Sequence, residues 1–163
     1  MRRITILVVV AMVTSLAAAA TIARAAAPTQ DWVDIDETFT WDDCGFAVEE
    51  HDVLTLHFIM WTDASGNPTR RLVTAPGARV TYTNPATGAS VTSPNPFVAH
   101  RTYNADGSFT VATTGLVFSI HGGGKAYVDS GRFVFRFANG ALTPITDSGP
   151  SADLCEALTA AIG

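Results

Sequence analysis

Residues 53–62 read VLTLHFIMWT, and this stretch shows most clearly which kind of fold the chain adopts. Every second residue is apolar: Leu54, Leu56, Phe58 and Met60. Successive side chains of a β-strand point to opposite faces, so the alternation predicts a strand with one fully apolar face. The residues in between mix Thr and His with apolar side chains, which is typical of a central strand or a strand in a barrel.

The same period of two recurs on both sides of this stretch. Residues 33–42 read VDIDETFTWD, with apolar side chains at every second position except Glu37. Nearer the C-terminus, Phe133, Phe135 and Phe137 alternate with Arg132, Val134 and Arg136. Both segments therefore predict strands, and the second is expected to contribute three aromatic rings to a core.

Turn signals divide the rest of the chain at short intervals. Gly, Pro, Asn and Asp gather at residues 63–68, 84–88, 93–96, 104–107, 121–124 and 139–140. Strand-like runs lie between them at residues 69–74, 78–83, 89–93, 97–103, 108–114, 116–121, 127–137 and 141–145. This spacing predicts an all-β fold, an antiparallel β-barrel of about eight strands, in which closure removes exposed edges. Gly115 and Gly131 interrupt strand-like runs, as glycines do at bulges or sharp bends.

The C-terminal segment has a different period. Residues 151–162 read SADLCEALTAAI and place Leu154, Leu158 and Ile162 four residues apart, as on one face of a helix. Ser151 is the expected N-cap, and Asp153 lies in the first turn, where the helix dipole favours a carboxylate. We expect this short helix to pack its apolar stripe on one end of the barrel.

The N-terminal 27 residues have the pattern of a secretory signal peptide. Arg2 and Arg3 precede an apolar run over residues 4–22, and Ala23-Arg24-Ala25 is a small-x-small cleavage site. The alternative is an uncleaved anchor, because the run is 19 residues long and a membrane span needs about 20. Cleavage predicts a secreted, extracellular protein with one domain over residues 28–163 and no membrane association after cleavage.

Charge and cysteine content agree with that interpretation. Cleavage removes three of the ten basic residues and none of the fifteen acidic ones, and so excess negative charge disfavours nucleic acid as a partner. Cys44 and Cys155 are the two cysteines, and an even pair in an exported protein predicts a disulfide. The alternative, a catalytic or metal-binding thiol pair, lacks the C-x-x-C spacing.

Four segments carry a resemblance to other proteins. They are residues 43–48 (DCGFAV), 83–91 (TNPATGASV), 103–108 (YNADGS) and 153–158 (DLCEAL). With them the chain resembles a group of uncharacterised secreted actinobacterial proteins, a likeness that implies no activity. At the level of fold alone, the layout is similar to the small antiparallel barrels of the allene oxide cyclase, dirigent and lipocalin kind.

No motif identifies a catalytic centre. Nine carboxylates lie in residues 31–52, yet they lack the calcium-loop spacing of an EF-hand, and a solvated strand face explains them. The four histidines, His51, His57, His100 and His121, could supply a three-ligand metal site, but their spacing is unspecific. Asp129-Ser130-Gly131 and Asp147-Ser148-Gly149 match the aspartic-protease tripeptide but are more typical of turns. We therefore expect no cofactor and no metal, and the sequence leaves catalytic residues unknown.

Aromatic side chains supply the remaining candidate site, since an eight-stranded barrel can either fill with them or enclose one small molecule. The candidate ligand-binding residues are His57, Trp61, His100, Tyr103 and Phe118. They favour a secreted, non-enzymatic protein that binds a small apolar ligand or a cell-envelope component. The alternative is an isomerase or hydrolase that uses His57 or His100 with a carboxylate inside the barrel.

Overall fold

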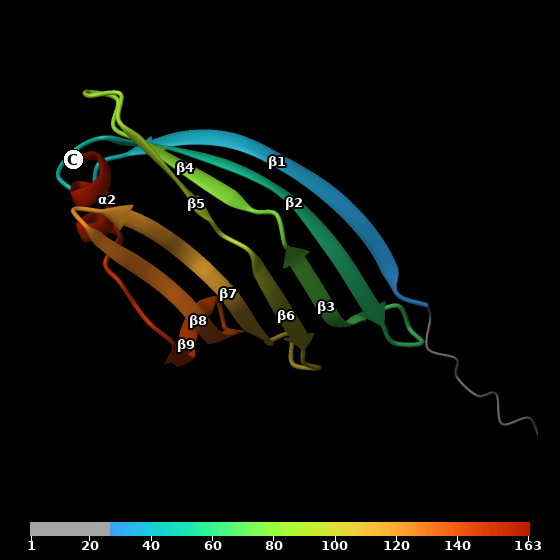
Figure 1. Ribbon diagram of the computed structural model, residues 1–163. Helices are drawn as coiled ribbons and strands as arrows, with labels where there is room; N and C mark the ends of the chain where they lie inside the picture. Colours follow the sequence, from blue (N-terminus) through green and yellow to red (C-terminus); the bar gives the residue numbers. More distant parts are fainter. Residues whose placement is uncertain (1–26) are drawn as a thin grey trace, which may run out of the picture.

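The computed structural model describes residues 27–163, which form one antiparallel sheet of nine strands and a C-terminal helix, α2 (Leu154–Ile162) (Figure 1). The strands are β1 (Thr29–Trp41), β2 (Val48–Thr62), β3 (Pro68–Ala75), β4 (Arg79–Thr83), β5 (Ser90–Pro94), β6 (Phe97–Tyr103), β7 (Phe109–Gly122), β8 (Lys125–Ala138) and β9 (Ala141–Ser148). The predicted signal peptide, apart from Ala27, lies outside the described residues.

The strands follow one another as a meander with two broken strands. β1 pairs along one side of β2, and on the other side the first half of β2 pairs with β4 while its second half pairs with β3. In the same way β5 pairs with β4, and β6 pairs with β3. β3 and β4 therefore lie end to end, as do β5 and β6, and the sheet continues through β7 and β8 to β9.

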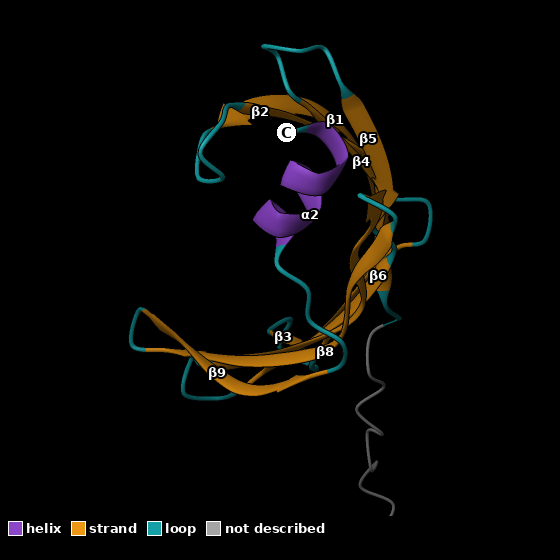
Figure 2. Cartoon of the chain, turned by 60° about the vertical axis from the view of Figure 1, so that its left-hand side comes forward, coloured by secondary structure: helices purple, strands orange, loops and turns teal. Residues whose placement is uncertain are grey.

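The sheet is curved but open, so the prediction of a closed barrel of about eight strands is wrong. Among the described strands, β1 pairs only with β2 and β9 only with β8, which leaves one free edge on each. Figure 2 shows the sheet as a C-shaped wall with α2 inside the curve, between its two arms. The helix takes up space that strand side chains fill in a closed barrel of this size.

A line of prolines and glycines crosses the sheet where it bends. Pro76 and Gly77 separate β3 from β4, and Pro96 follows β5. Next to them Gly115 of β7 pairs with Gly131 of β8, and the ladder shifts register just beyond, between residues 116 and 118. A bulge or sharp bend was predicted at Gly115 and Gly131, and the register shift confirms an irregularity of the ladder beside them. Residues 93–96, predicted as a turn, instead join two strands that run on in the same direction.

The glycines of this line are required by close backbone contact. A Cβ atom on Gly115 would lie 2.5 Å from the carbonyl oxygen of Pro96, and one on Gly131 would overlap the carbonyl oxygen of Ser148. Gly131 also has a φ of 152°, a conformation that side chains disfavour. Larger residues would push neighbouring strands apart at the bend.

The hydrophobic core lies at one end of the curve, where α2 covers the concave face. Leu158 and Ala157 are fully buried against a cluster of strand residues: Val48, Val80, Tyr82, Phe118, Ile120 and Tyr127. The side chain of Asp153, not the predicted Ser151, caps the helix and accepts a hydrogen bond from the Glu156 backbone N–H at 2.8 Å. The Asp153 carboxylate reaches this donor because it is three residues upstream, the usual N-cap geometry.

The predicted disulfide between Cys44 and Cys155 is confirmed. Their Cα atoms lie 4.9 Å apart, and the bridge spans 111 positions in the sequence. Cys44 lies between β1 and β2, whereas Cys155 lies in the first turn of α2. The bond therefore holds the helix to the first hairpin of the sheet.

Candidate functional site

The concave face extends beyond the helix as an open, mostly apolar surface. Val48 of β2 packs in the core beneath α2. Because β1 pairs with β2 without a register shift, every second residue of β2 from Val48 to Met60 points to this same concave face. Cross-strand partners share a face, which extends the surface to β8. We call this surface the trough; its apolar members are Leu56, Phe58, Met60, Val73, Phe97, Ala99, Phe109, Val111, Phe133, Phe135 and Phe137.

One cross-strand row shows how continuous the trough is. Phe58, Val73, Ala99, Thr113 and Phe133 are successive partners across β2, β3, β6, β7 and β8. All five are partly exposed, because no helix covers this half of the sheet (Figure 2). A continuous apolar surface of this kind is uncommon on a folded chain, and it makes the trough the candidate site.

Two of the hollows on the described residues lie along the trough. One, of about 200 Å³, lies at the bend and is lined mainly by Phe97, Thr113, Leu116 and Phe133. The other, of about 330 Å³, lies beside β1, and its lining includes Phe58, Met60 and Arg71. A small molecule bound in the trough would have concave apolar walls at both places.

Two arginines project from the floor of the trough. Arg71 of β3 and Arg101 of β6 are direct cross-strand partners. The Arg71 guanidinium lies 4.3 Å from the ring centroid of Phe58, and the Arg101 guanidinium lies 4.3 Å from that of Phe109. Both charges are thus held over aromatic faces, an arrangement that orients them without neutralising them.

Carboxylates separate the trough from the core. Glu50 and Asp52 share the concave face of β2 with Val48, and the Trp41 indole donates a hydrogen bond to Glu50 Oε2 at 2.8 Å. Burial raises the pKa of Glu50. Burial also raises the pKa of Asp52, and the negative charge of the nearby Glu37 carboxylate raises it further. Desolvation raises the pKa of Tyr82 as well, since its hydroxyl lies in the core beside these acids.

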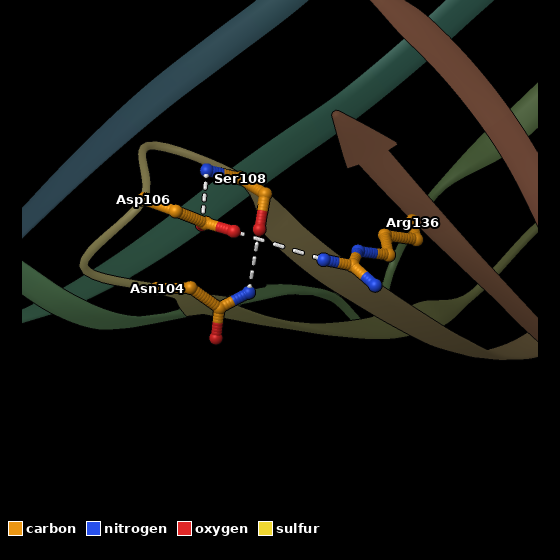
Figure 3. Close-up of polar contacts among 4 residues, drawn as sticks. All are labelled: Asn104, Asp106, Ser108 and Arg136. Atoms are coloured by element: carbon orange, nitrogen blue, oxygen red, sulfur yellow. Dashed lines mark hydrogen bonds and ion pairs between the residues drawn. The ribbon is translucent and has the colours of Figure 1, made fainter. Parts of the chain in front are cut away.

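A hydrogen-bonded turn between β6 and β7 lies at the far end of the trough (Figure 3). Asp106 accepts from the Ser108 backbone N–H at 2.9 Å, and Asn104 donates from its amide to the Ser108 hydroxyl at 2.9 Å. Arg136 of β8 lies 3.8 Å from Asp106. The hydrogen bonds from Ser108, with help from Arg136, lower the pKa of Asp106. The turn fixes the ends of β6 and β7, where Phe109 stacks on Phe137 at 4.9 Å.

The histidines that sequence favoured as site residues lie on the convex face. His57 alternates with Leu56 and Phe58, stacks on Trp32 at 3.9 Å and contacts the Gln30 side-chain oxygen at 3.0 Å. His100 alternates in the same way with Ala99 and Arg101. Neither histidine shares the concave face with a carboxylate.

The five predicted ligand-binding residues are not brought together. Trp61 lies on the convex face with His57, and the Arg70 guanidinium lies over its ring at 3.9 Å. Phe118 is 2% exposed in the core beneath α2. Tyr103 alone lies in the trough, at its far end beside Phe109, with ring centroids 6.1 Å apart.

The sequence did contain the signal for the two residues that were missed. Arg71 lies two positions from Val73, and Arg101 lies two positions from Ala99, so each arginine shares the face of an apolar neighbour on its own strand. An arginine on the apolar face of a strand is rare enough to question. The sequence pattern does not show that the two arginines are neighbours, because only the register of β3 and β6 places them side by side.

A histidine and a carboxylate do meet elsewhere, at the surface. His51 Nε2 lies 2.7 Å from Asp36 Oδ1, with 42% and 76% of the two side chains exposed. The pair lies on the convex face of β1 and β2 without an enclosing cavity. Over residues 27–163, no three His, Cys, Asp or Glu side chains are placed to hold a metal ion.

No helix in this part of the chain combines the length and the apolar character that crossing a membrane requires.

Comparison with known proteins gives no relative from which a function could be carried over. No protein-family model, no curated protein and no solved structure matches the chain. The fold and the candidate site are therefore defined by the geometry of this chain alone: an open antiparallel sheet with a disulfide-held helix and an uncovered apolar face.

Proposed function

We propose that the protein binds a small apolar molecule in the trough and has no catalytic role. The observation that carries this proposal is the row from Phe58 to Phe133, in which side chains of five adjacent strands, four of them apolar and the fifth Thr113, stay partly exposed. Covering about 300 Å² of such a surface would contribute roughly 7 kcal/mol before the costs of association. A bound ligand would cover this apolar surface and gain the free energy of burial, and no second domain would be needed to cover it.

Extracellular action is part of the same proposal. The Cys44–Cys155 bond supports it, because structural disulfides persist in oxidising compartments. A cell-envelope component would then be a natural source of an apolar ligand. The open trough and the free edges of β1 and β9 also allow a larger envelope molecule to approach from the side.

The alternative of a barrel enzyme gains no support from the site. It requires a histidine and a carboxylate that face a common cavity. His57 and His100 lie on the convex face, and the inward carboxylates Glu50 and Asp52 lie on the concave one. No observation favours a second candidate function.

Titration with the uncharged fluorescent probe N-phenyl-1-naphthylamine tests the proposal. Ala99→Trp places a bulky ring in the middle of the trough, whereas Val98→Trp places the same ring on the convex face of the same strand. We expect the wild-type protein and Val98→Trp to bind the probe with similar affinity, and Ala99→Trp to bind it at least tenfold more weakly. Equal binding by both variants, or no binding by the wild-type protein, would show that the trough is not the site.

A further inference from the structure

The pairing of Arg71 with Arg101 is an anomaly of the trough. The two residues face each other directly across β3 and β6, where Cβ atoms of partners lie about 4.5–5.5 Å apart. Their guanidinium groups turn to opposite sides, one over Phe58 of β2 and the other over Phe109 of β7, each 4.3 Å from the ring centroid. Two positive charges thus lie on either side of one place in an apolar surface, and covering that surface is favourable only if a negative group pairs with them.

The described part of the chain does not supply that negative charge. Its two ion pairs join His51 to Asp36 and Arg136 to Asp106. Asp31 lines the same hollow as Arg71, but its Oδ1 accepts the backbone N–H of Trp32 at 2.8 Å and forms no ion pair with the arginine. The arginines keep their donors available, in a protein that carries more acidic than basic residues.

The surroundings of the two arginines define what else the ligand must have. The next cross-strand row toward the bend contains Val73, Ala99 and Phe133. The row after it contains Phe97, which lies four residues from Arg101 on β6. Four residues of a strand span about 13 Å, and at that distance lies the hollow lined by Phe97, Leu116 and Phe133. The trough thus has two positive charges at Arg71 and Arg101, and a continuous apolar surface runs from them toward the bend.

We propose that the ligand is a long-chain fatty-acid anion, whose carboxylate lies between Arg71 and Arg101 and whose chain lies in the trough toward Phe97. The guanidinium fork matches a carboxylate in geometry and forms paired, charge-assisted hydrogen bonds with it. One carboxylate would give both arginines a negative partner, and the apolar rows would cover the chain. This inference rests on the proposed function, because it specifies the class of ligand that the trough receives.

The test compares a charged and an uncharged ligand of equal chain length. Calorimetric titrations use palmitate and 1-hexadecanol, below the concentrations at which they aggregate, with wild-type protein and Arg71→Gln/Arg101→Gln. Arg70→Gln is the matched control, because Arg70 also lies over an aromatic ring, Trp61 at 3.9 Å, but on the convex face. Thermal unfolding checks that each variant folds, and Arg101→Gln alone replaces the double variant if that one does not.

We expect the wild-type protein and Arg70→Gln to bind palmitate equally. The double variant should bind palmitate at least tenfold more weakly and should bind hexadecanol unchanged. If the double variant binds palmitate as tightly as the wild-type protein, or if the wild-type protein binds no palmitate, the inference is overturned. The uncharged naphthylamine probe decides the proposed function separately, so that failure of the fatty-acid inference and failure of the trough as a binding site are distinguishable.

Discussion

Gly131 shows how a single residue sets the shape of this sheet. It lies opposite Gly115 on one side, and on the other side it meets the backbone at Ser148 and Gly149, so three glycines lie along the bend. Pairing of two backbones at this short range leaves no volume for a side chain. The curvature that forms the trough thus depends on the absence of side chains at these positions.

Replacement of Gly131 by alanine is expected to destabilise the protein by about 2–4 kcal/mol, because the new Cβ would overlap the Ser148 carbonyl oxygen at an unfavourable φ. Urea unfolding followed by circular dichroism measures the change. The control is Gly77→Ala at the same bend, where a Cβ meets no atom within 4 Å, and its stability should stay within about 1 kcal/mol of wild type. Equal stability of the two variants would mean that the close contact at Gly131 is absent in solution.

At the scale of elements, β2 combines two environments along one face. Its inward side chains begin with Val48 in the core, continue with Glu50 and Asp52, and end with Leu56, Phe58 and Met60 in the trough. The two carboxylates are partly desolvated where the helix-covered half meets the open half. The raised pKa values of Glu50 and Asp52 mean that burial makes their charged forms less favourable in the folded chain than in the unfolded one.

The raised pKa of Glu50 predicts a pH dependence of stability. A carboxyl group whose pKa is higher in the folded state imposes no penalty below its ordinary pKa of 4.5. The penalty appears as pH rises through the raised value, and so stability falls toward neutral pH. Glu50→Gln removes this penalty and keeps an oxygen that accepts from Trp41. We expect the variant to gain under about 1 kcal/mol at pH 7, because the site is partly solvated, and nothing at pH 3.

Thermal unfolding between pH 3 and pH 7 measures the difference between the two curves. Glu49→Gln is the matched control, because Glu49 is the exposed neighbour on the convex face of the same strand. That variant should follow the wild-type curve throughout. A loss of stability in Glu50→Gln at pH 7 would instead show that the charged form of Glu50 is favoured in the fold.

At the scale of the whole molecule, the disulfide holds the helix over one half of the concave face, and the other half stays uncovered. Cys44 and Cys155 join the first hairpin to α2, and the loop that they close covers most of the chain, with a separation of 111. β9 is exposed along its whole length, and β1 nearly so. Acidic side chains at Asp34 and Asp36 on β1 disfavour pairing with another strand at that free edge.

Removal of the disulfide is expected to lower the free energy of unfolding by about 4–5 kcal/mol, as chain entropy predicts for a loop of this length. Cys44→Ser/Cys155→Ser, compared with the oxidised wild-type protein by urea unfolding, gives the value. Hydrogen exchange should show the largest loss of protection in α2, which then keeps only its apolar contacts. Uniform loss of protection across β3, β6 and α2 would contradict a local role of the bond in holding the helix.

Much of this architecture could be predicted from the sequence, because strand periodicity, helix periodicity and an even cysteine pair are local or combinatorial signals. The alternation in residues 53–62, the C-terminal helix and the Cys44–Cys155 bond are examples. The location of the bend was also predictable, since Gly115 and Gly131 interrupt strands for a steric reason. Proline and glycine occur both at chain reversals and at kinks, however, and the sequence does not distinguish the two. Residues 93–96 were therefore predicted as a turn that reverses the chain, although they join two strands of the same direction.

Tertiary structure alone decided whether the sheet closes and which side chains meet. Alternation divides each strand into two faces but does not say which face becomes concave, and for that reason His57, Trp61 and His100 were expected to bind a ligand although they lie outside the curve. Closure of the sheet depends on the distance between its first and last strands, β1 and β9, and no local sequence pattern determines that distance. In this protein α2 lies inside the curve of the sheet, between its two sides. Arg71 and Arg101 are 30 residues apart in the chain, and only the register of β3 with β6 makes them cross-strand partners.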